Sequence, residues 1–196
     1  MKYILICVFF LFSALLMSCT RPHEFAGTEL DPPPQATDFT GVNWDGAPFH
    51  LKELQGKVVL LFFGYTSCPD VCPMTLAEMK DLYAQLGNDA QDVAVVLVTV
   101  DPERDTVQRL AEYVPAFDPA FYGVYLEPDV LEEVKSAYGI YAEKVETGDT
   151  QPATDYLVDH SGYVLVVDTE GRWRLVYSFG TTADEMLPDI RYLLRE

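Results

Sequence analysis

The segment Lys57-Val-Val-Leu-Leu-Phe-Phe-Gly64 gives the clearest indication of the fold, because every residue between its two ends is apolar. A continuous apolar run of this length is typical of a strand that is buried on both faces of a parallel sheet. A second run of the same kind lies further along the chain, at Val93-Ala-Val-Val-Leu-Val-Thr-Val100. These two runs predict buried strands in a sheet that helices cover.

Around these strands the sequence predicts helices and further strands. After Pro73, apolar residues recur at near-helical spacing until Gly87 closes the segment. Asp45-Gly46 marks a hairpin turn between two short apolar stretches. Further helices are expected over residues 105–113 and 128–138, and further strands over residues 156–159, 163–168 and 174–177. Strands that alternate with helices and finish with a hairpin and a helix predict a three-layer α/β domain.

The last helix carries two signals that disagree. Thr182 and Glu185 have the spacing of a capping box, and the apolar residues after them share one helical face. Pro188 has no backbone N–H to donate and is disfavoured inside a helix. We therefore expect this helix to begin after the capping box or to be kinked.

The composition describes an acidic globular protein. The chain has 196 residues, of which 49% are hydrophobic, and its 13 Lys and Arg against 31 Asp and Glu give a formal charge of −18. A strongly acidic surface repels the phosphates of nucleic acids and anionic lipid headgroups. Nucleic-acid binding is therefore excluded as a function, and we expect no nucleic-acid partner.

The N-terminus has the features of an export signal. Lys2 precedes an apolar run over residues 3–17, which is shorter than the ~20 residues that a membrane-spanning helix needs. Leu16-Met17-Ser18-Cys19 resembles a bacterial lipoprotein box, in which cleavage leaves a lipid-modified cysteine at the new N-terminus. We therefore interpret residues 1–18 as a lipoprotein signal peptide and Cys19 as the lipidation site. An ordinary signal peptide and an uncleaved anchor remain alternatives, and each of them also locates the domain outside the cytoplasm.

A proline-marked segment follows the signal. The run Pro32-Pro33-Pro34 favours an extended polyproline II conformation, and the residues before it are polar. We interpret residues 19–36 as a linker and residues 37–196 as one domain.

The remaining cysteines form a candidate site. Cys7 lies in the signal and Cys19 is the lipidation candidate, which leaves Cys68 and Cys72. These two follow a buried strand and precede a helix, where reactive groups emerge at the carboxyl end of a sheet. Their i, i+4 spacing directs both sulfurs to one side of a helical turn, and a helix N-terminus favours thiolates. The pair is therefore suited to binding a soft metal or to disulfide exchange.

A metal centre would need a third ligand, and the chain has only three histidines. His23 lies in the linker and His50 in a surface-like stretch, so we expect both to be solvated. His160 lies at the junction of two predicted strands, where a side chain can be held rigidly. Two cysteines and one histidine suit trigonal Cu(I) and fall one short of a closed structural zinc site. From the residues alone, a hydrogen-bonded histidine of the core or a turn is the favoured interpretation of His160.

Three blocks of the sequence together resemble the Sco/SenC family of copper-binding cytochrome c oxidase assembly proteins, in its bacterial lipoprotein form. They are Gly64-Tyr-Thr-Ser-Cys-Pro-Asp-Val-Cys-Pro73, Val100-Asp-Pro-Glu-Arg-Asp-Thr106 and Tyr156-Leu-Val-Asp-His-Ser161. The resemblance extends over residues 39–194. It implies a thioredoxin-like fold with a central mixed sheet.

The resemblance also implies the site. Copper would be bound by Cys68, Cys72 and His160, as Cu(I) and also as Cu(II), which would need a further oxygen or nitrogen ligand. Asp101 is equally compatible with capping the helix that Pro102 opens and with a redox or docking role near the metal. Asp159 is left out of the site, because neighbouring side chains on a strand point to opposite faces.

The expected function is that of a metallochaperone held at the outer face of a cell membrane by lipid. The family implies delivery of copper to the binuclear copper site of a cytochrome c oxidase subunit, with a copper donor or a thiol reductant as a further partner. The main alternative is a thiol–disulfide oxidoreductase that uses Cys68 and Cys72 to reduce partner cysteines. A peroxiredoxin is disfavoured, because Leu61 and Tyr65 stand where its Pro and Thr would be. A purely structural disulfide would close only a five-residue loop, worth roughly 2 kcal/mol.

Overall fold

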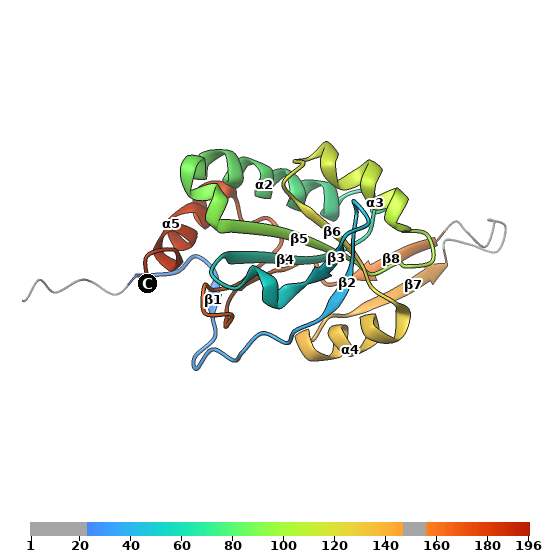
Figure 1. The fold of residues 1–196 in the computed structure, drawn as a ribbon, viewed down its shortest axis with the longest axis horizontal. Coiled ribbons are helices and arrows are strands. Elements are labelled where there is room, and N and C mark those ends of the chain that lie inside the picture. Colours follow the sequence, from blue (N-terminus) through green and yellow to red (C-terminus); the bar gives the residue numbers. More distant parts are fainter. Residues whose placement is uncertain (1–22, 147–155) are drawn as a thin grey trace, which may run out of the picture.

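The computed structural model describes residues 23–146 and 156–196. The signal peptide and Cys19 lie outside these residues. The described chain forms an eight-stranded sheet and a separate two-stranded sheet (Figure 1). In the large sheet the strands follow the order β1 (Thr28–Glu29), β10 (Trp173–Tyr177), β9 (Val164–Val167), β4 (Val58–Gly64), β5 (Val93–Thr99), β6 (Tyr122–Tyr125), β2 (Thr40–Asn43) and β3 (Pro48–His50).

The centre of this sheet is the part that the apolar runs predicted. All residues of β4 and β5 are buried, and the two strands pair in parallel from Val58 and Val93 to Gly64 and Thr99. β6 continues the parallel part, whereas β9 runs antiparallel to β4 on its other side. The sheet is therefore mixed, as expected.

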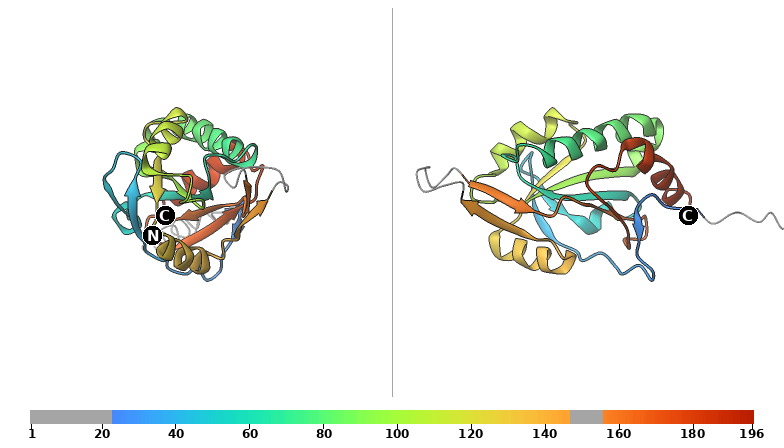
Figure 2. Two further views of the ribbon diagram at one scale, coloured as in Figure 1. Left: turned by 90° about the vertical axis from the view of Figure 1, so that its right-hand side faces the viewer. Right: turned by 180° about the vertical axis from the view of Figure 1, so that it is seen from behind.

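Helices cover both faces of the sheet. α2 (Val71–Leu86), α3 (Val107–Tyr113) and α5 (Ala183–Leu193) lie on one face, and α4 (Pro128–Tyr138) lies on the other (Figures 1 and 2). Short 3-10 helices complete the connections at η1 (Leu51–Leu54), η2 (Gly87–Asp92) and η3 (Val114–Ala116). These three layers confirm the α/β architecture.

Local signals were confirmed with small shifts at the ends of elements. The turn at Asp45-Gly46 joins β2 to β3, and Gly46 has a φ of 82°, which glycine adopts without strain. α2 begins two residues before Pro73, at Val71. The last helix differs from expectation: its capping box is formed and the helix begins at Ala183, so Pro188 lies inside it. The reciprocal bonds of the capping box therefore determine where this helix starts.

The described part of the expected linker packs against the domain. β1 pairs with β10, the Ala36 N–H donates to the Gly171 carbonyl, and Phe25 packs on the core. His23, which we expected to be solvated, lies with Nε2 2.7 Å from Asp189 Oδ1 and stacks on Tyr192. Residues 23–36 therefore belong to the folded unit, because their backbone groups pair with a strand that is distant in sequence.

The small sheet is a ribbon of β7 (Ala142–Glu146) and β8 (Tyr156–His160), paired antiparallel. It lies beside the large sheet at the end opposite the C-terminus (Figure 1). The predicted strand over residues 156–159 is thus confirmed, but it pairs outside the main sheet. Among the described helices, none combines the length and the apolar composition needed to cross a membrane.

Candidate metal centre

The cysteine pair lies where the central strand β4 gives way to α2. Cys68 is in the connecting loop, with its N–H donating to the Tyr65 carbonyl at 3.3 Å. Cys72 is in the first turn of α2, and its N–H points to Cys68 Sγ at 3.5 Å. Cys68 is partly exposed, whereas Cys72 has no exposed surface. Cys68 is therefore the more exposed of the two cysteines.

The close approach of Cys72 to β4 depends on Gly64. A Cβ atom at Gly64 would lie 2.7 Å from Cys72 Sγ and 2.9 Å from the ring of Phe62. Contacts this short are not tolerated without movement of the neighbour. The absence of a side chain at the end of β4 thus makes room for the sulfur.

A buried carboxylate fixes the start of the cysteine loop. Asp105 accepts hydrogen bonds from the Thr66 N–H at 2.8 Å, the Thr66 hydroxyl at 2.6 Å and the Thr99 hydroxyl at 2.8 Å. It has no exposed surface, and this burial raises its pKa, although the hydrogen bonds act in the opposite direction. Asp105 thereby ties the loop after β4 to the end of β5.

His160 reaches the sulfurs from the ribbon. It is the last residue of β8, and its Nε2 lies 3.3 Å from Cys72 Sγ. Its Nδ1 lies 3.0 Å from the Ser161 carbonyl, which can only accept, so Nδ1 donates and Nε2 is the ring nitrogen that faces the sulfurs. The rings of Phe62 and Tyr65 meet the imidazole edge to face.

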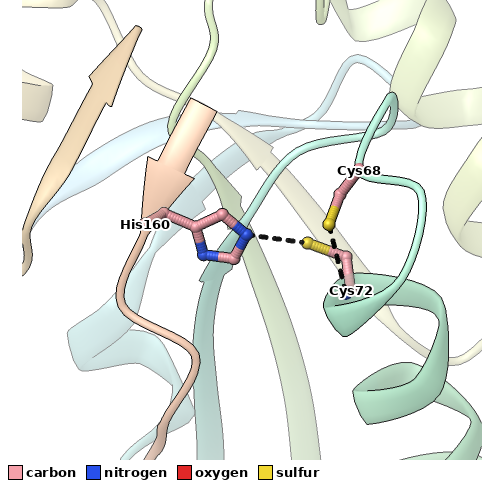
Figure 3. Close-up of side chains that lie close together, drawn as sticks. All are labelled: Cys68, Cys72 and His160. Carbon is pink, nitrogen blue, oxygen red and sulfur yellow. Dashed lines mark hydrogen bonds between the residues drawn. The ribbon is translucent and has the colours of Figure 1, made fainter. Parts of the chain in front are cut away.

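The three side chains point toward one another (Figure 3). Their ligand atoms all lie within 4.8 Å of one another, and no fourth His, Cys, Asp or Glu joins them among the described residues. Ligands at bond lengths of about 2.1–2.3 Å around a trigonal ion are separated by roughly 3.8–4.0 Å, so small movements of the side chains, some inward and some outward, would complete such a site. His50 ends β3 at the edge of the large sheet and is not part of this cluster.

In the metal-free centre the pKa values of the two cysteines are shifted in opposite directions. The hydrogen bond from Cys72 lowers the pKa of Cys68 to about 3, helped by His160 and backbone N–H groups and opposed by burial. The same hydrogen bond, together with burial, raises the pKa of Cys72. Burial disfavours a charged His160, but hydrogen bonds to Cys68 and the Ser161 carbonyl outweigh it and raise the pKa of the ring. Cys68 is thus a thiolate that Cys72 supports with its proton.

Asp101 does not cap a helix in the structure. Pro102 opens a turn, and α3 begins only at Val107, where Thr106 serves as the cap. The Asp101 carboxylate, 2% exposed, instead pairs with Arg104 and accepts a hydrogen bond from the Tyr156 hydroxyl at 2.6 Å. The helix-capping interpretation is therefore wrong, because a turn intervenes between the strand and the helix. Asp159 is exposed, as its exclusion from the site requires.

Sequence reasoning missed several residues that shape the centre. Gly64, Tyr65 and Asp105 contact the ligands or the loop that carries them, yet none belongs to a metal-binding residue pattern. The available signal was the resemblance to a family, because all three residues lie inside the blocks 64–73 and 100–106 that carry it.

Two thiol sulfurs and an imidazole nitrogen make a soft donor set. Such ligands select Cu(I) over the hard ions Mg²⁺ and Ca²⁺, and a closed structural zinc site would need a fourth ligand. The residues present therefore fit Cu(I), and the partial exposure of Cys68 leaves one side of the centre open to a partner.

Comparison with known proteins agrees with this chemistry. The sequence model of the family described as SCO1/SenC matches residues 27–195. A SCO2-like protein of Rickettsia conorii is 30% identical over 154 residues, covering 79% of this chain and 74% of that protein.

Solved structures share the fold. The apo Sco1 protein of Thermus thermophilus has a TM-score of 0.76 and 38% identity, covering 88% of this chain and 99% of that chain. The ScoI protein of Bradyrhizobium japonicum, solved with copper bound, has a TM-score of 0.74 and 34% identity, covering 81% of this chain and 99% of that chain. These likenesses confirm the thioredoxin-like fold, and the chain belongs to the SCO1/SenC family.

Proposed function

We propose that this protein is a membrane-anchored copper chaperone that binds one Cu(I) through Cys68, Cys72 and His160. The observation that carries the proposal is the convergence of the three ligand atoms within 4.8 Å of one another. Membership of the Sco family, whose members are cytochrome c oxidase assembly proteins, supports delivery to the binuclear copper site of that oxidase. Copper is thus the cargo of the protein.

Loading requires little rearrangement of the chain. Cys68 is already a thiolate, because its pKa is lowered to about 3, so the ion would meet an anionic sulfur at once. Cys72 would lose its proton as the ion binds, since thiolates and not thiols ligate metals. A neutral His160 would supply Nε2, whose orientation the Ser161 carbonyl fixes through Nδ1.

Release would proceed by ligand exchange with the partner. Three-coordinate Cu(I) leaves space for an incoming thiolate, and the partly exposed Cys68 is the side from which it would approach. Binding of Cu(II) is part of the proposal too. It would need an additional oxygen or nitrogen ligand, which the partner or water would supply, because Cu(II) prefers tetragonal geometry.

An apolar surface beside the centre supports docking of a partner on this side. Met74 and Phe179 are 52% and 46% exposed and line a pocket of about 120 Å³ together with Gly162. A Cβ at Gly162 would lie 3.2 Å from Val71 and 3.6 Å from Phe179, so this surface continues to Val71, the residue directly before Cys72. The formal charge of −18 favours a partner surface that carries Lys and Arg around an apolar side chain.

The anchor in this proposal is lipid on Cys19. The sequence Leu16-Met17-Ser18-Cys19 supports it, since it resembles a lipoprotein box. Stable attachment takes two or more acyl chains, because a single chain binds a membrane only weakly. The copper-binding domain would then face the periplasm or the cell exterior.

A second function is favoured by one observation, the low pKa of the accessible Cys68 beside Cys72. A thiolate of this kind attacks a partner disulfide, and Cys72 would then resolve the mixed disulfide. Two thiols of this chain would become a disulfide while the partner's disulfide becomes two thiols. The same surface would serve both reactions.

A transfer assay distinguishes the two functions. Protein loaded with Cu(I) is mixed anaerobically with the metal-free copper-site domain of its own organism's cytochrome c oxidase, and the copper in each is measured after separation. We expect transfer, and we expect Phe179→Ser to slow it severalfold while its Cu(I) affinity is unchanged. Complete retention of copper would contradict the chaperone. Reduction of an oxidised copper-site domain by metal-free protein, without copper transfer, would favour the oxidoreductase.

A further inference from the structure

We propose that Arg104 is a positioning residue for the metal centre: together with Asp101 it holds strand β8 so that His160 reaches the two sulfurs. The inference deepens the proposed function, since it rests on His160 as a ligand. It assigns to the Asp101–Arg104 pair a role in the geometry of the centre without contact to the metal.

The need for such a device follows from the topology. β8 pairs only with β7 among the described residues, and no backbone ladder joins it to the large sheet. Cys68 and Cys72, in contrast, follow a central strand of that sheet. His160 is joined to the large sheet by the short link to β9, which begins at Val164, and contacts from side chains set the rest of its position relative to the sulfurs.

The first contact is at Tyr156, the residue that begins β8. Its hydroxyl donates to Asp101 Oδ1 at 2.6 Å, and its carbonyl accepts from Arg104 Nη1 at 2.8 Å. The Arg104 guanidinium also stacks over the Tyr156 ring, with Cζ 3.6 Å from the ring centroid. Asp101 in turn pairs with Arg104 Nε, so both the ring and the backbone of Tyr156 are held.

The second contact links β8 directly to the cysteine loop. The Val158 N–H donates to the Tyr65 hydroxyl at 3.1 Å, while the Tyr65 carbonyl accepts from the Cys68 N–H. The Arg104 guanidinium lies 5.6 Å from the centroid of the Tyr65 ring as well. Arg104 thus contacts a tyrosine of β8 and also the tyrosine whose carbonyl accepts from the Cys68 N–H.

Because side chains alternate between the two faces of a strand, the contacts at Tyr156 and Val158 also determine where the His160 side chain points. Tyr156 and Val158 are buried and share one face of β8 with His160. At about 3.3 Å per residue, His160 lies roughly 13 Å along the strand from Tyr156, so two fixed points on the strand, at Tyr156 and Val158, define the direction in which the imidazole projects. Lysine would not substitute for Arg104, because stacking and a directed hydrogen bond at once need a planar guanidinium.

A positioning role differs from a merely structural role in a double-mutant cycle. Cu(I) affinity of the purified reduced protein is measured by competition with a chelator for wild type, Arg104→Met, His160→Ala and the double variant. We expect Arg104→Met to weaken Cu(I) binding about tenfold when His160 is present and to have no effect in the His160→Ala background, since partners that orient metal ligands typically contribute 10–100-fold. Arg104→Lys is expected to behave like Arg104→Met.

Two controls keep the test decisive. Arg172→Met breaks an ion pair with Asp168. Asp168 follows Val167, which pairs with Val59, so it lies at the opposite end of β4 from Gly64. We expect this variant to bind Cu(I) with unchanged affinity. Tyr156→Phe removes only the hydroxyl that donates to Asp101. We expect it to weaken Cu(I) binding less than Arg104→Met does, and again only when His160 is present. This variant replaces Arg104→Met in the cycle if Arg104→Met does not fold.

The outcomes separate this inference from the function beneath it. Equal weakening by Arg104→Met in both backgrounds, or no weakening in either, would overturn the positioning role while leaving the three-ligand centre intact. An unchanged affinity in His160→Ala alone would contradict His160 as a ligand, and the role of Arg104 would fall with it.

Discussion

The two halves of the metal centre are held in different ways. Cys68 and Cys72 follow β4, which has strand partners on both sides within the eight-stranded sheet. His160 ends β8, which is tied to the rest of the domain by the side chains of Tyr65, Asp101 and Arg104. The thiolate half therefore follows a strand of the central sheet, whereas the imidazole half lies outside that sheet and is held by side-chain contacts and the short link to β9.

This difference suits a protein that must both hold and release a metal. Two ligands fixed by a buried sheet keep the thiolates close together in the empty state. One ligand on a separately held ribbon can withdraw without unfolding the domain, because local openings cost less than global unfolding. We expect metal exchange to begin with movement of β8.

The largest effect is expected from the thiolate half. Cys68→Ser or Cys72→Ser removes a soft sulfur and leaves a hydroxyl that is a poor ligand for Cu(I), so stoichiometric binding should be lost. Met74→Leu, which removes an exposed sulfur close to the pair, is the matched control and should bind as wild type does. Retained tight binding in either cysteine variant would exclude that sulfur from the centre.

Hydrogen exchange of the metal-free protein compares the two halves directly. Amides in β4 and β5 are expected to exchange at least about 100-fold more slowly than those of β8, because the former are buried in the central sheet and the latter open locally. Cu(I) should raise protection in β8 and leave β4 unchanged, since it ties His160 to the thiolates. Equal protection of β8 and β5 before loading would contradict a loosely held imidazole half.

Gly64→Ala tests how closely the thiolate half is packed. The new Cβ would meet Cys72 Sγ at 2.7 Å, so we expect a loss of about 1–3 kcal/mol in the free energy of unfolding from overpacking. The displaced sulfur should also weaken Cu(I) binding about tenfold.

The matched control for Gly64→Ala is Gly123→Ala. Its Cβ would also lie 2.7 Å from a side chain, Val114 Cγ2, but on strand β6 and away from the cysteines. This variant should lose stability without losing affinity. A similar loss of affinity in both variants would show that general destabilisation, and not displacement of Cys72, is responsible.

The smallest effect is a pH dependence that should be nearly absent. Because the pKa of Cys68 is lowered to about 3, this residue stays a thiolate from pH 5 to 7 and loses that charge only as the pH falls toward 3. Its alkylation rate in reduced metal-free protein should therefore change less than about twofold over this range, whereas an ordinary thiol with a pKa near 8.5 gains about 100-fold. The buried Cys72 should remain unmodified.

Mass spectrometry after reaction with iodoacetamide at several pH values measures both cysteines at once. Free glutathione in the same solution is the control for the reagent. A rate at Cys68 that rises tenfold per pH unit, in parallel with glutathione, would show that Cys72 does not stabilise the thiolate.

The thiolate half was largely predictable from the sequence, and the imidazole half was not. Continuous apolar runs identified β4 and β5, and the spacing of Cys68 and Cys72 after β4 identified a reactive pair, because these features are local. His160 was ambiguous from the residues alone and became a candidate ligand only through the resemblance to a family. Its partner atoms come from a loop distant in sequence, and periodicity carries no information on such contacts.

The remaining errors have the same cause. Residues 23–36 contain proline and few apolar residues, yet they pair with β10 at the other end of the chain. Helix capping was one of the two roles open to Asp101, because the next residue is Pro102, but its carboxylate instead contacts Arg104 and Tyr156. In each case a contact between distant segments outweighed a local preference.

The most direct test of the three-ligand centre is an anaerobic Cu(I) competition titration of the reduced wild-type protein and of the His160→Ala variant. We predict one tightly bound Cu(I) per chain in the wild type and a loss of affinity of about 100-fold or more in the variant, because a direct ligand contributes at least as much as the groups that orient it. Equal affinities would show that the two thiolates bind without the imidazole half, and a wild type that cannot compete with the chelator would contradict the copper centre as a whole.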